Sequence, residues 1–296
     1  MSGANWFIFG AGFSGLETGR IVAANGMKAA GTTRTPERFA ALAEAGLEPF
    51  VFDGRWLDKS VLQRLGEVTH LLMSIGPNEN GDPLVPAYAK QLRHHTGNLE
   101  WIGYLSTVGV YGDHDGAWVD ETTQCKPVSQ RSFDRLDAEK SWAAFADASR
   151  VPLATLRLSG ISGPGRNTFG NLADGSAKRI IKPGQVFNRI HVKDIARAAL
   201  HLGAGHTGGL FNITDSEPAP PQDVVTFAAG LMGVAPPPEI AYDDASMSPM
   251  ARSFYGEVKR VSNAKVRTTG FVFDYPDYRT ALTAMWQNGE WQGGRH

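Results

Sequence analysis

Cysteine is almost absent from this chain, since Cys125 is the only one in 296 residues. A single cysteine excludes an internal disulfide and any cysteine-rich metal site. The His, Asp and Glu residues also fail to match the spacing of a dedicated metal site. We therefore expect no bound metal.

Long apolar runs and an excess of one charge are missing as well. No apolar run approaches the roughly 20 residues that span a bilayer, and no basic segment of a signal peptide precedes the apolar residues 6–9. The 29 Lys and Arg residues balance 30 Asp and Glu residues, whereas a nucleic-acid or acidic-membrane binder normally shows a basic excess. We expect a cytoplasmic protein with no nucleic-acid or membrane partner.

Glycine, in contrast, is abundant. The chain has 34 glycines and 17 prolines, together about 17% of its residues, where about 12% is usual. Hydrophobic residues make up 42% and charged residues 20%, which is ordinary for a globular protein and argues against disorder. The extra glycine must therefore serve particular positions.

The first half of the chain alternates short apolar runs with helical stretches. This alternation predicts a doubly wound parallel sheet covered by helices on both faces, a Rossmann fold of the α/β class. The expected strands are 6–9, 27–32, 47–52, 69–74, 100–106 and 153–158, and the expected helices are 13–25, 36–45, 59–65, 84–95 and 131–150.

After residue 158 the pattern becomes loop-rich. We expect a loop at 160–165, a helix at 194–202 and a strand at 210–213. No clean linker separates the two halves. We therefore expect a dinucleotide-binding Rossmann domain over residues 1–158 and a smaller, mostly substrate-binding region over 159–296, with segments that return to the Rossmann core.

The first excess glycines form the pattern G-x-G-x-x-G, with Phe13 and Ser14 as its last two variable positions. The pattern follows the first expected strand and opens the first expected helix, as the dinucleotide fingerprint requires. Gly10 permits the tight turn, Gly12 lets the backbone approach a pyrophosphate, and Gly15 lets helix and strand pack closely. We expect these five residues to bind a dinucleotide.

The end of the second expected strand bears on which dinucleotide is bound. An NAD enzyme usually has an acidic residue there, but Thr33 and Arg34 occupy this position and no carboxylate follows until Glu37. A guanidinium suits a 2′-phosphate, so NADP is favoured and NAD is the alternative. Arg34 as a solvated surface residue is the other interpretation. Asp53 is expected near the adenine, or else as the initiator of a turn before Gly54.

Ser74, Ile75 and Gly76 end the fourth expected strand. Small residues are expected where backbone passes close to a ligand. We expect these three residues beside the cofactor ribose.

Four segments together resemble the extended short-chain dehydrogenase/reductase superfamily, and more narrowly its atypical branch of NAD-dependent epimerase/dehydratase-like proteins. The resemblance covers nearly the whole chain and is specific for fold and cofactor, much less so for substrate. The segments are 10–15, 104–112, 156–165 and 189–196.

The resemblance implies a catalytic Ser or Thr, a Tyr and a Lys, the last two as Tyr-x-x-x-Lys-x-x-x-Glu on the helix after the fifth strand. Thr107 matches the Ser/Thr position, and Ser106 beside it is expected to contact the cofactor. Anchoring the helix on Glu139 places Arg135 at the lysine position and Arg131 at the tyrosine position, so the resemblance implies that the usual tyrosine is missing.

Arg135 can still donate hydrogen bonds to ribose hydroxyls. Arg131 stays protonated and cannot replace a tyrosine as acid or base, but it can stabilise an oxyanion or grip an anionic substrate. The alternative is that both arginines are surface cations of the helix.

Further residues follow from the same resemblance. It implies that Gly160 and Ile161 lie at the nicotinamide end of the cofactor. Tyr111, His191 and Tyr255 are candidate substrate contacts, although a structural role is the favoured interpretation of Tyr111 and His191. Relatives often form homodimers, here through helices 84–95 and 131–150.

Two functions remain open at this point. The first is an NADP-dependent oxidoreductase or epimerase/dehydratase-like enzyme with a non-standard proton donor, acting on a small carbonyl, hydroxyl or nucleotide-sugar-like substrate. The second is a non-catalytic NADP(H)-binding redox sensor or regulatory module, because the usual acid/base residue is missing.

Overall fold

The computed structural model describes residues 3–293. The chain forms two compact units, each assembled from separate stretches of sequence. The first unit contains the residues up to Val110, Ser129–Arg157 and Ile195–Phe211. The second contains Tyr111–Val128, Leu158–Asp194 and the residues from Asn212 onward.

The first unit is built on a seven-stranded parallel sheet with the order β11-β7-β5-β4-β1-β2-β3. The order reverses between β1 and β4, which is where a doubly wound sheet binds its ligand, beyond the carboxyl ends of the strands. The strands are β1 (Asn5–Phe9), β2 (Lys28–Thr33), β3 (Glu48–Val51), β4 (His70–Met73), β5 (Trp101–Thr107), β7 (Leu153–Leu158) and β11 (Gly209–Ile213).

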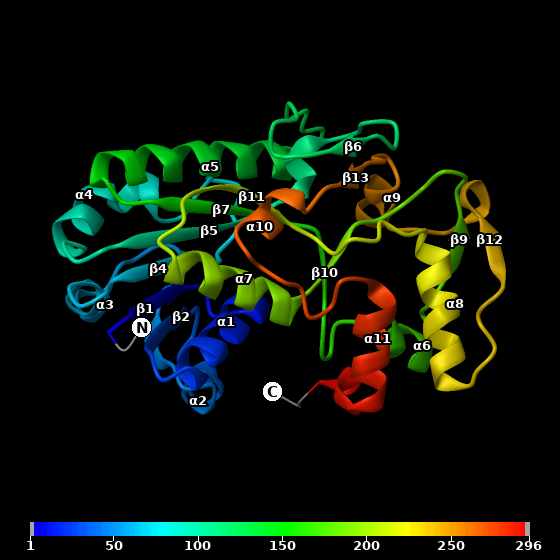
Figure 1. Ribbon diagram of the computed structural model, residues 1–296, viewed down its shortest axis with the longest axis horizontal. Coiled ribbons are helices and arrows are strands. Elements are labelled where there is room, and N and C mark those ends of the chain that lie inside the picture. Colours follow the sequence, from blue (N-terminus) through cyan, green and yellow to red (C-terminus); the bar gives the residue numbers. More distant parts are fainter. Residues whose placement is uncertain (1–2, 294–296) are drawn as a thin grey trace. The chain divides into compact units, whose positions relative to one another are not determined.

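Helices cover both faces of this sheet (Figure 1). Successive residues of β1 point to opposite faces, so Phe7 and Phe9 join the core beneath the face that bears α5, whereas Trp6 stacks on His70 with ring centroids 4.9 Å apart on the other face. The helices of this unit are α1 (Phe13–Ala24), η1 (Pro36–Arg38), α2 (Phe39–Glu44), α3 (Lys59–Leu65), α4 (Val85–His95), η2 (Val108–Tyr111), α5 (Gln130–Ser149) and α7 (Val192–Ala204), with η2 and α7 each extending into the second unit.

The expected doubly wound Rossmann sheet is confirmed. The strand 153–158 and the helix 59–65 have the predicted bounds. The helix begins where predicted because Asp58 caps it by accepting a hydrogen bond from the Ser60 amide at 2.8 Å. The loop expected at 160–165 is partly wrong. Its first three residues form β8 (Gly160–Ser162), which pairs in parallel with β10 (Arg189–His191). A three-residue strand that begins with glycine has no periodicity to reveal it.

The second unit consists of short strand pairs and a helical cluster. Besides β8 and β10, β6 (Trp118–Val119) pairs with β13 (Arg260–Val261), and β9 (Arg179–Ile181) pairs with β12 (Glu239–Ala241). An apolar core around Phe169 and Met285 holds α6, α8 and α11 together. The helices are α6 (Thr168–Ala173), α8 (Pro221–Met232), η3 (Tyr242–Asp244), α9 (Pro249–Phe254), α10 (Ala264–Thr268), α11 (Tyr278–Gln287) and η4 (Glu290–Gln292).

Candidate functional site

The glycine loop lies between β1 and α1. Gly10 has a φ of +86°, and a Cβ there would stand 2.6 Å from Cγ1 of Ile75. A Cβ on Gly15 would collide with the carbonyl oxygen of Gly10. Two hydrogen bonds tie the loop to β2, because the Gly10 amide donates to the Thr32 hydroxyl at 2.8 Å and the Ala11 amide donates to the Thr32 carbonyl at 2.7 Å. Gly10 and Gly15 are therefore required by the loop itself.

Gly12 is different, since a Cβ there would have nothing within 4 Å. It is the N-cap residue of α1, and no side chain caps this helix. A helix N-terminus offers backbone N–H groups and a positive dipole end to an anion. The open space beside Gly12 and the uncapped helix fit a dinucleotide pyrophosphate.

The end of β2 carries the residues predicted to select the cofactor. Thr33 is buried, whereas Arg34 is exposed directly after it. Arg38 in η1 is a second exposed arginine, four residues on, and the sequence interpretation missed it. Glu37 is engaged locally, because the Thr35 hydroxyl bonds its carboxylate and lowers its pKa. Two exposed arginines therefore follow β2, at the position predicted to select the cofactor.

Asp53 follows β3 and forms a local turn. Its Oδ1 accepts hydrogen bonds from the amides of Arg55 at 2.9 Å and Trp56 at 3.4 Å. This is the turn-forming alternative stated for Asp53 above. An adenine contact through its second carboxylate oxygen stays a prediction.

Arg135 faces the residues that end β4. Its Nη1 donates to the Leu105 carbonyl at 2.8 Å and to the Tyr104 hydroxyl at 3.3 Å. A Cβ on Gly76 would stand 2.7 Å from Arg135 Nη2, while Ser74 and Ile75 are half-buried in the same segment. Burial raises the pKa of Tyr104 to about 12 in spite of the nearby guanidinium, so Tyr104 keeps its proton.

Ser106 belongs to a buried network rather than to an open surface. Its hydroxyl donates to Glu139 at 2.5 Å, and Arg157 donates to the same carboxylate through Nε at 3.1 Å and Nη2 at 2.7 Å. Both charged side chains are at most 10% exposed. The network joins α5 to β5 and β7, and so it fixes the helix that carries Arg131 and Arg135.

Thr107 and Arg131 are the other two residues predicted to be catalytic. Thr107 Oγ1 accepts a hydrogen bond from the Gly109 amide at 3.1 Å, and among the described residues its own proton has no recorded acceptor. Arg131 lies in the first turn of α5 and is exposed, one turn before the half-buried Arg135. The helix therefore presents one arginine inward and one to solvent.

The second unit holds the remaining predicted residues. Gly160 and Ile161 open β8. Tyr111 is fully buried and donates its hydroxyl proton to Asn212 Oδ1 at 2.8 Å, which is the structural role considered above. Tyr255 is 7% exposed and packs against Phe187.

His191 is buried with one ring nitrogen satisfied. Its Nδ1 accepts a hydrogen bond from the Lys193 amide at 3.3 Å, while Nε2 is buried without a partner. Tyr275 packs on the ring at a centroid distance of 4.0 Å. Burial, with a smaller effect of Lys193, lowers the pKa of His191 to about 4. The ring is therefore neutral at pH 7 and carries its proton on Nε2.

Arg189 and Asp215 are two further polar groups that the sequence interpretation missed. Asp215 is 3% exposed, and burial raises the pKa of its carboxyl to about 8. Arg189 donates through Nη1 to the carbonyls of Phe187 at 2.9 Å and Ala219 at 3.1 Å. The only sequence signal for Arg189 was its place two residues before His191 in the segment 189–196.

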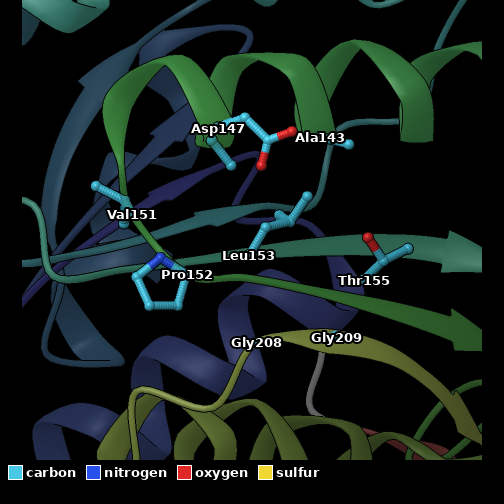
Figure 2. A pocket seen from close by; sticks show the side chains of 9 residues that line it. Ala143, Asp147, Val151, Pro152, Leu153, Thr155, Gly208 and Gly209 are labelled. Atoms are coloured by element: carbon cyan, nitrogen blue, oxygen red, sulfur yellow. The ribbon is translucent and has the colours of Figure 1, made fainter.

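A shallow hollow of about 350 Å³ lies elsewhere on the first unit (Figure 2). Pro152 and Leu153 line it where β7 begins, and Gly208 and Gly209 line it where β11 begins. It lies at the amino ends of these strands and therefore not at the carboxyl edge where the glycine loop stands. We do not assign it to the candidate site.

No group of three or more His, Cys, Asp or Glu side chains in residues 3–293 is placed to hold a metal ion. No helix in that range is long and apolar enough to cross a membrane.

Solved structures similar to this chain were found over nearly its whole length. A conserved protein of unknown function from Silicibacter pomeroyi DSS is 42% identical, with a TM-score of 0.89 over 97% of this chain and 99% of that one. A putative NAD-dependent epimerase/dehydratase from Methylobacillus flagellatus is 23% identical, with a TM-score of 0.71 over 97% and 99%. The human epimerase family protein SDR39U1, solved with NADPH, is 16% identical, with a TM-score of 0.72 over 96% and 99%. No protein-family model and no curated protein matches the chain.

Proposed function

Because the chain belongs to the same family as the conserved Silicibacter pomeroyi protein and has the fold of the NAD-dependent epimerase/dehydratase-like proteins, we propose that it is an NADP(H)-dependent oxidoreductase or epimerase/dehydratase-like enzyme. The observation that carries this proposal is the glycine loop. Gly10 and Gly15 are required by the fold, whereas Gly12 leaves open space at an uncapped helix N-terminus. Such a space suits a pyrophosphate.

The preference for NADP rests on the cations after β2. Arg34 and Arg38 are exposed, and the nearest carboxylate, Glu37, is bonded to Thr35. Guanidinium groups form paired, charge-assisted hydrogen bonds with phosphate. The human neighbour was solved with NADPH, while the Methylobacillus flagellatus neighbour is named for NAD. The arginines tip the choice toward NADP(H).

The remaining groups of the first unit have roles that follow from their contacts. Arg135 is fixed by Leu105 and faces Gly76, so Nη2 can donate to ribose hydroxyls. Thr107 accepts from the Gly109 amide, and its proton is available to orient a reacting oxygen. A bound nicotinamide supplies or accepts a hydride. We propose the second unit as the substrate-binding part.

Binding of the two dinucleotides tests the cofactor proposal. Titration of the protein should give a dissociation constant for NADPH at least ten-fold below that for NADH. The double change Arg34→Ala with Arg38→Ala should remove most of this preference, because each charged hydrogen bond contributes about 1.5–3 kcal/mol. Arg93→Ala is the matched control, since Arg93 is an exposed arginine on α4. Equal affinity for NADH would contradict the choice of NADP.

Turnover tests the enzyme proposal. NADPH oxidation should be seen with members of a panel of carbonyl and nucleotide-sugar compounds, and Thr107→Ala should slow it. If the wild type binds NADPH tightly but its turnover does not exceed the background measured with a Gly12 variant, the enzyme proposal is contradicted.

A second candidate function is a non-catalytic NADP(H)-binding sensor. The exposed Arg131 at the tyrosine position favours it, as do the hydrogen-bonded and buried hydroxyls of Tyr104 and Tyr111. A partner protein whose affinity differs between NADP and NADPH would support this candidate. Partner binding that ignores the nucleotide would contradict it.

A further inference from the structure

Arg189 and His191 in the second unit share one face of β10. Alternate residues of a strand point to the same side, and these two are separated along it by about 6.6 Å. Ile190 between them points the other way and is 1% exposed. One side of a three-residue strand thus carries a guanidinium and an imidazole.

The guanidinium of Arg189 is held in place but only partly used. Its Nη1 donates to two carbonyls, those of Phe187 and Ala219, and its Cζ lies 6.0 Å from the centre of the Tyr278 ring. Among the described residues, Nε and Nη2 have no recorded acceptor. A pinned guanidinium with two remaining donors matches the two oxygens of a carboxylate or phosphate.

His191 supplies a different kind of donor. Its proton is on Nε2, which is buried and unpartnered in a residue only 1% exposed. The loop that packs on it is fixed, because Asp194 accepts hydrogen bonds from the amides of Asp274 at 2.9 Å and Tyr275 at 2.8 Å. Buried polar groups normally have partners, so this neutral N–H points to an uncharged oxygen brought by a ligand.

The acidic surroundings decide between the two kinds of anion. Asp215 is buried and makes no salt bridge to Arg189 within the described residues. Its Oδ1 accepts from the Glu217 amide at 3.2 Å. Glu217 and Asp277 also act electrostatically on Asp215. Glu217 already pairs with Arg279, so Arg189 is the guanidinium left for a ligand here, and a single guanidinium favours a singly charged carboxylate over a doubly charged phosphate.

We propose that this face of β10 binds a small carboxylic acid with a carbonyl or hydroxyl oxygen next to its carboxylate. The carboxylate pairs with Nε and Nη2 of Arg189, and the neighbouring oxygen accepts from Nε2 of His191. The inference rests on the proposed function, because it names the substrate class that this unit would present.

Calorimetric titration of the full-length protein with pyruvate, lactate, methyl pyruvate and inorganic phosphate tests the inference. Pyruvate or lactate should bind, and methyl pyruvate, which lacks the charge, should bind at least ten-fold more weakly. Arg189→Met should weaken binding of the acids by at least ten-fold. Arg179→Met should leave binding unchanged, because Arg179 lies in the same unit but pairs with Glu239 at 2.6 Å.

Two substitutions of His191 separate a ligand contact from a structural one. His191→Gln can place an N–H near the original Nε2, whereas His191→Asn can accept from the Lys193 amide but does not reach that far. A ligand role predicts that the glutamine variant keeps affinity for the acids and the asparagine variant loses several-fold. A purely structural role predicts equal affinities of the two variants for the acids, and a lower thermal unfolding midpoint for the glutamine variant than for the asparagine variant.

The inference is overturned if none of the acids binds the wild type, if phosphate binds more tightly than pyruvate, or if a folded Arg189→Lys variant, which lacks the planar fork, binds the acids as well as the wild type. NADPH titration of the same samples reports separately on the proposed function. Normal NADPH binding without discrimination among the acids removes only this inference. Selective acid binding without any dinucleotide binding contradicts only the proposal that the protein binds NADP(H).

Discussion

The two units differ in whether their buried carboxylates and histidines have partners. In the first unit, the Glu139 carboxylate meets Arg157 at 2.7 Å, and both ring nitrogens of His70 have partners. In the second unit, Asp215 makes no salt bridge within the described residues, and Nε2 of His191 is unpartnered. Paired groups hold elements together, whereas unpaired ones make folding less favourable and are more often kept for a ligand.

The largest effect should come from breaking the paired carboxylate. Glu139→Ala removes the buried carboxylate that Arg157 and Ser106 bond, so the free energy of unfolding should fall by about 3–5 kcal/mol. Urea unfolding measures this loss. Asp137→Ala is the matched control on the same helix, because Asp137 forms a solvent-exposed ion pair with Lys140 at 2.7 Å. This pair should contribute under about 1 kcal/mol to the free energy of unfolding. Similar losses in the two variants would mean that the buried pair is not special.

The unpaired carboxyl should reveal itself through pH. Asp215 holds its proton to about pH 8 in the native state, while its ordinary pKa is 3.8. The native state therefore binds more protons between these values, and the free energy of unfolding falls as pH rises. His191 gives the opposite slope between about pH 4 and 6.5, so the window from pH 6.5 to 8 reports on Asp215.

In that window the decline should approach about 1.4 kcal/mol per pH unit. The Asp215→Asn variant should lack this component and become more stable than the wild type as pH rises. Urea unfolding at pH 6.5, 7.25 and 8 measures the difference between the two proteins. A difference that does not change with pH would mean that Asp215 is ionised in the native state.

A smaller effect separates the two histidines. His70→Phe keeps a ring against Trp6 but removes the hydrogen bonds of the imidazole nitrogens to the Gly203 carbonyl and the Thr69 hydroxyl. The free energy of unfolding should therefore fall by about 1–3 kcal/mol. Ligand-free His191→Phe also removes an unsatisfied donor, and only the Lys193 amide loses an acceptor. Its loss should be smaller. Equal losses in thermal or urea unfolding would contradict the distinction.

The fold of the first unit could be predicted from the sequence because its elements are long enough to show a period. The strand 153–158 is mostly apolar, with leucine at 153, 156 and 158, and the helix 59–65 is bounded by Asp58 and Gly66. The second unit could be predicted only coarsely. Its strands β8, β9 and β10 have three residues each, which is too short for any alternation to show.

The candidate site was predictable only where a residue type has one strong physical reason. Gly10 and Gly15 are such residues, because a Cβ would clash at both. Ser106 was expected at the cofactor, but its bond to Glu139 depends on a contact 33 residues away. Arg157 was the one indication of this network in the sequence, since an arginine inside a buried strand implies a buried acidic partner. Nothing in the sequence indicates that Asp215 is buried.

Dinucleotide binding by the Gly12→Ala variant tests the central claim most directly. The added methyl group has no protein atom within 4 Å, so the unfolding midpoint should change little. The same methyl group would occupy the space assigned to the pyrophosphate, so the affinity for NADPH should fall at least ten-fold below the wild type. A folded Gly12→Ala variant that binds NADPH as tightly as the wild type would contradict the account.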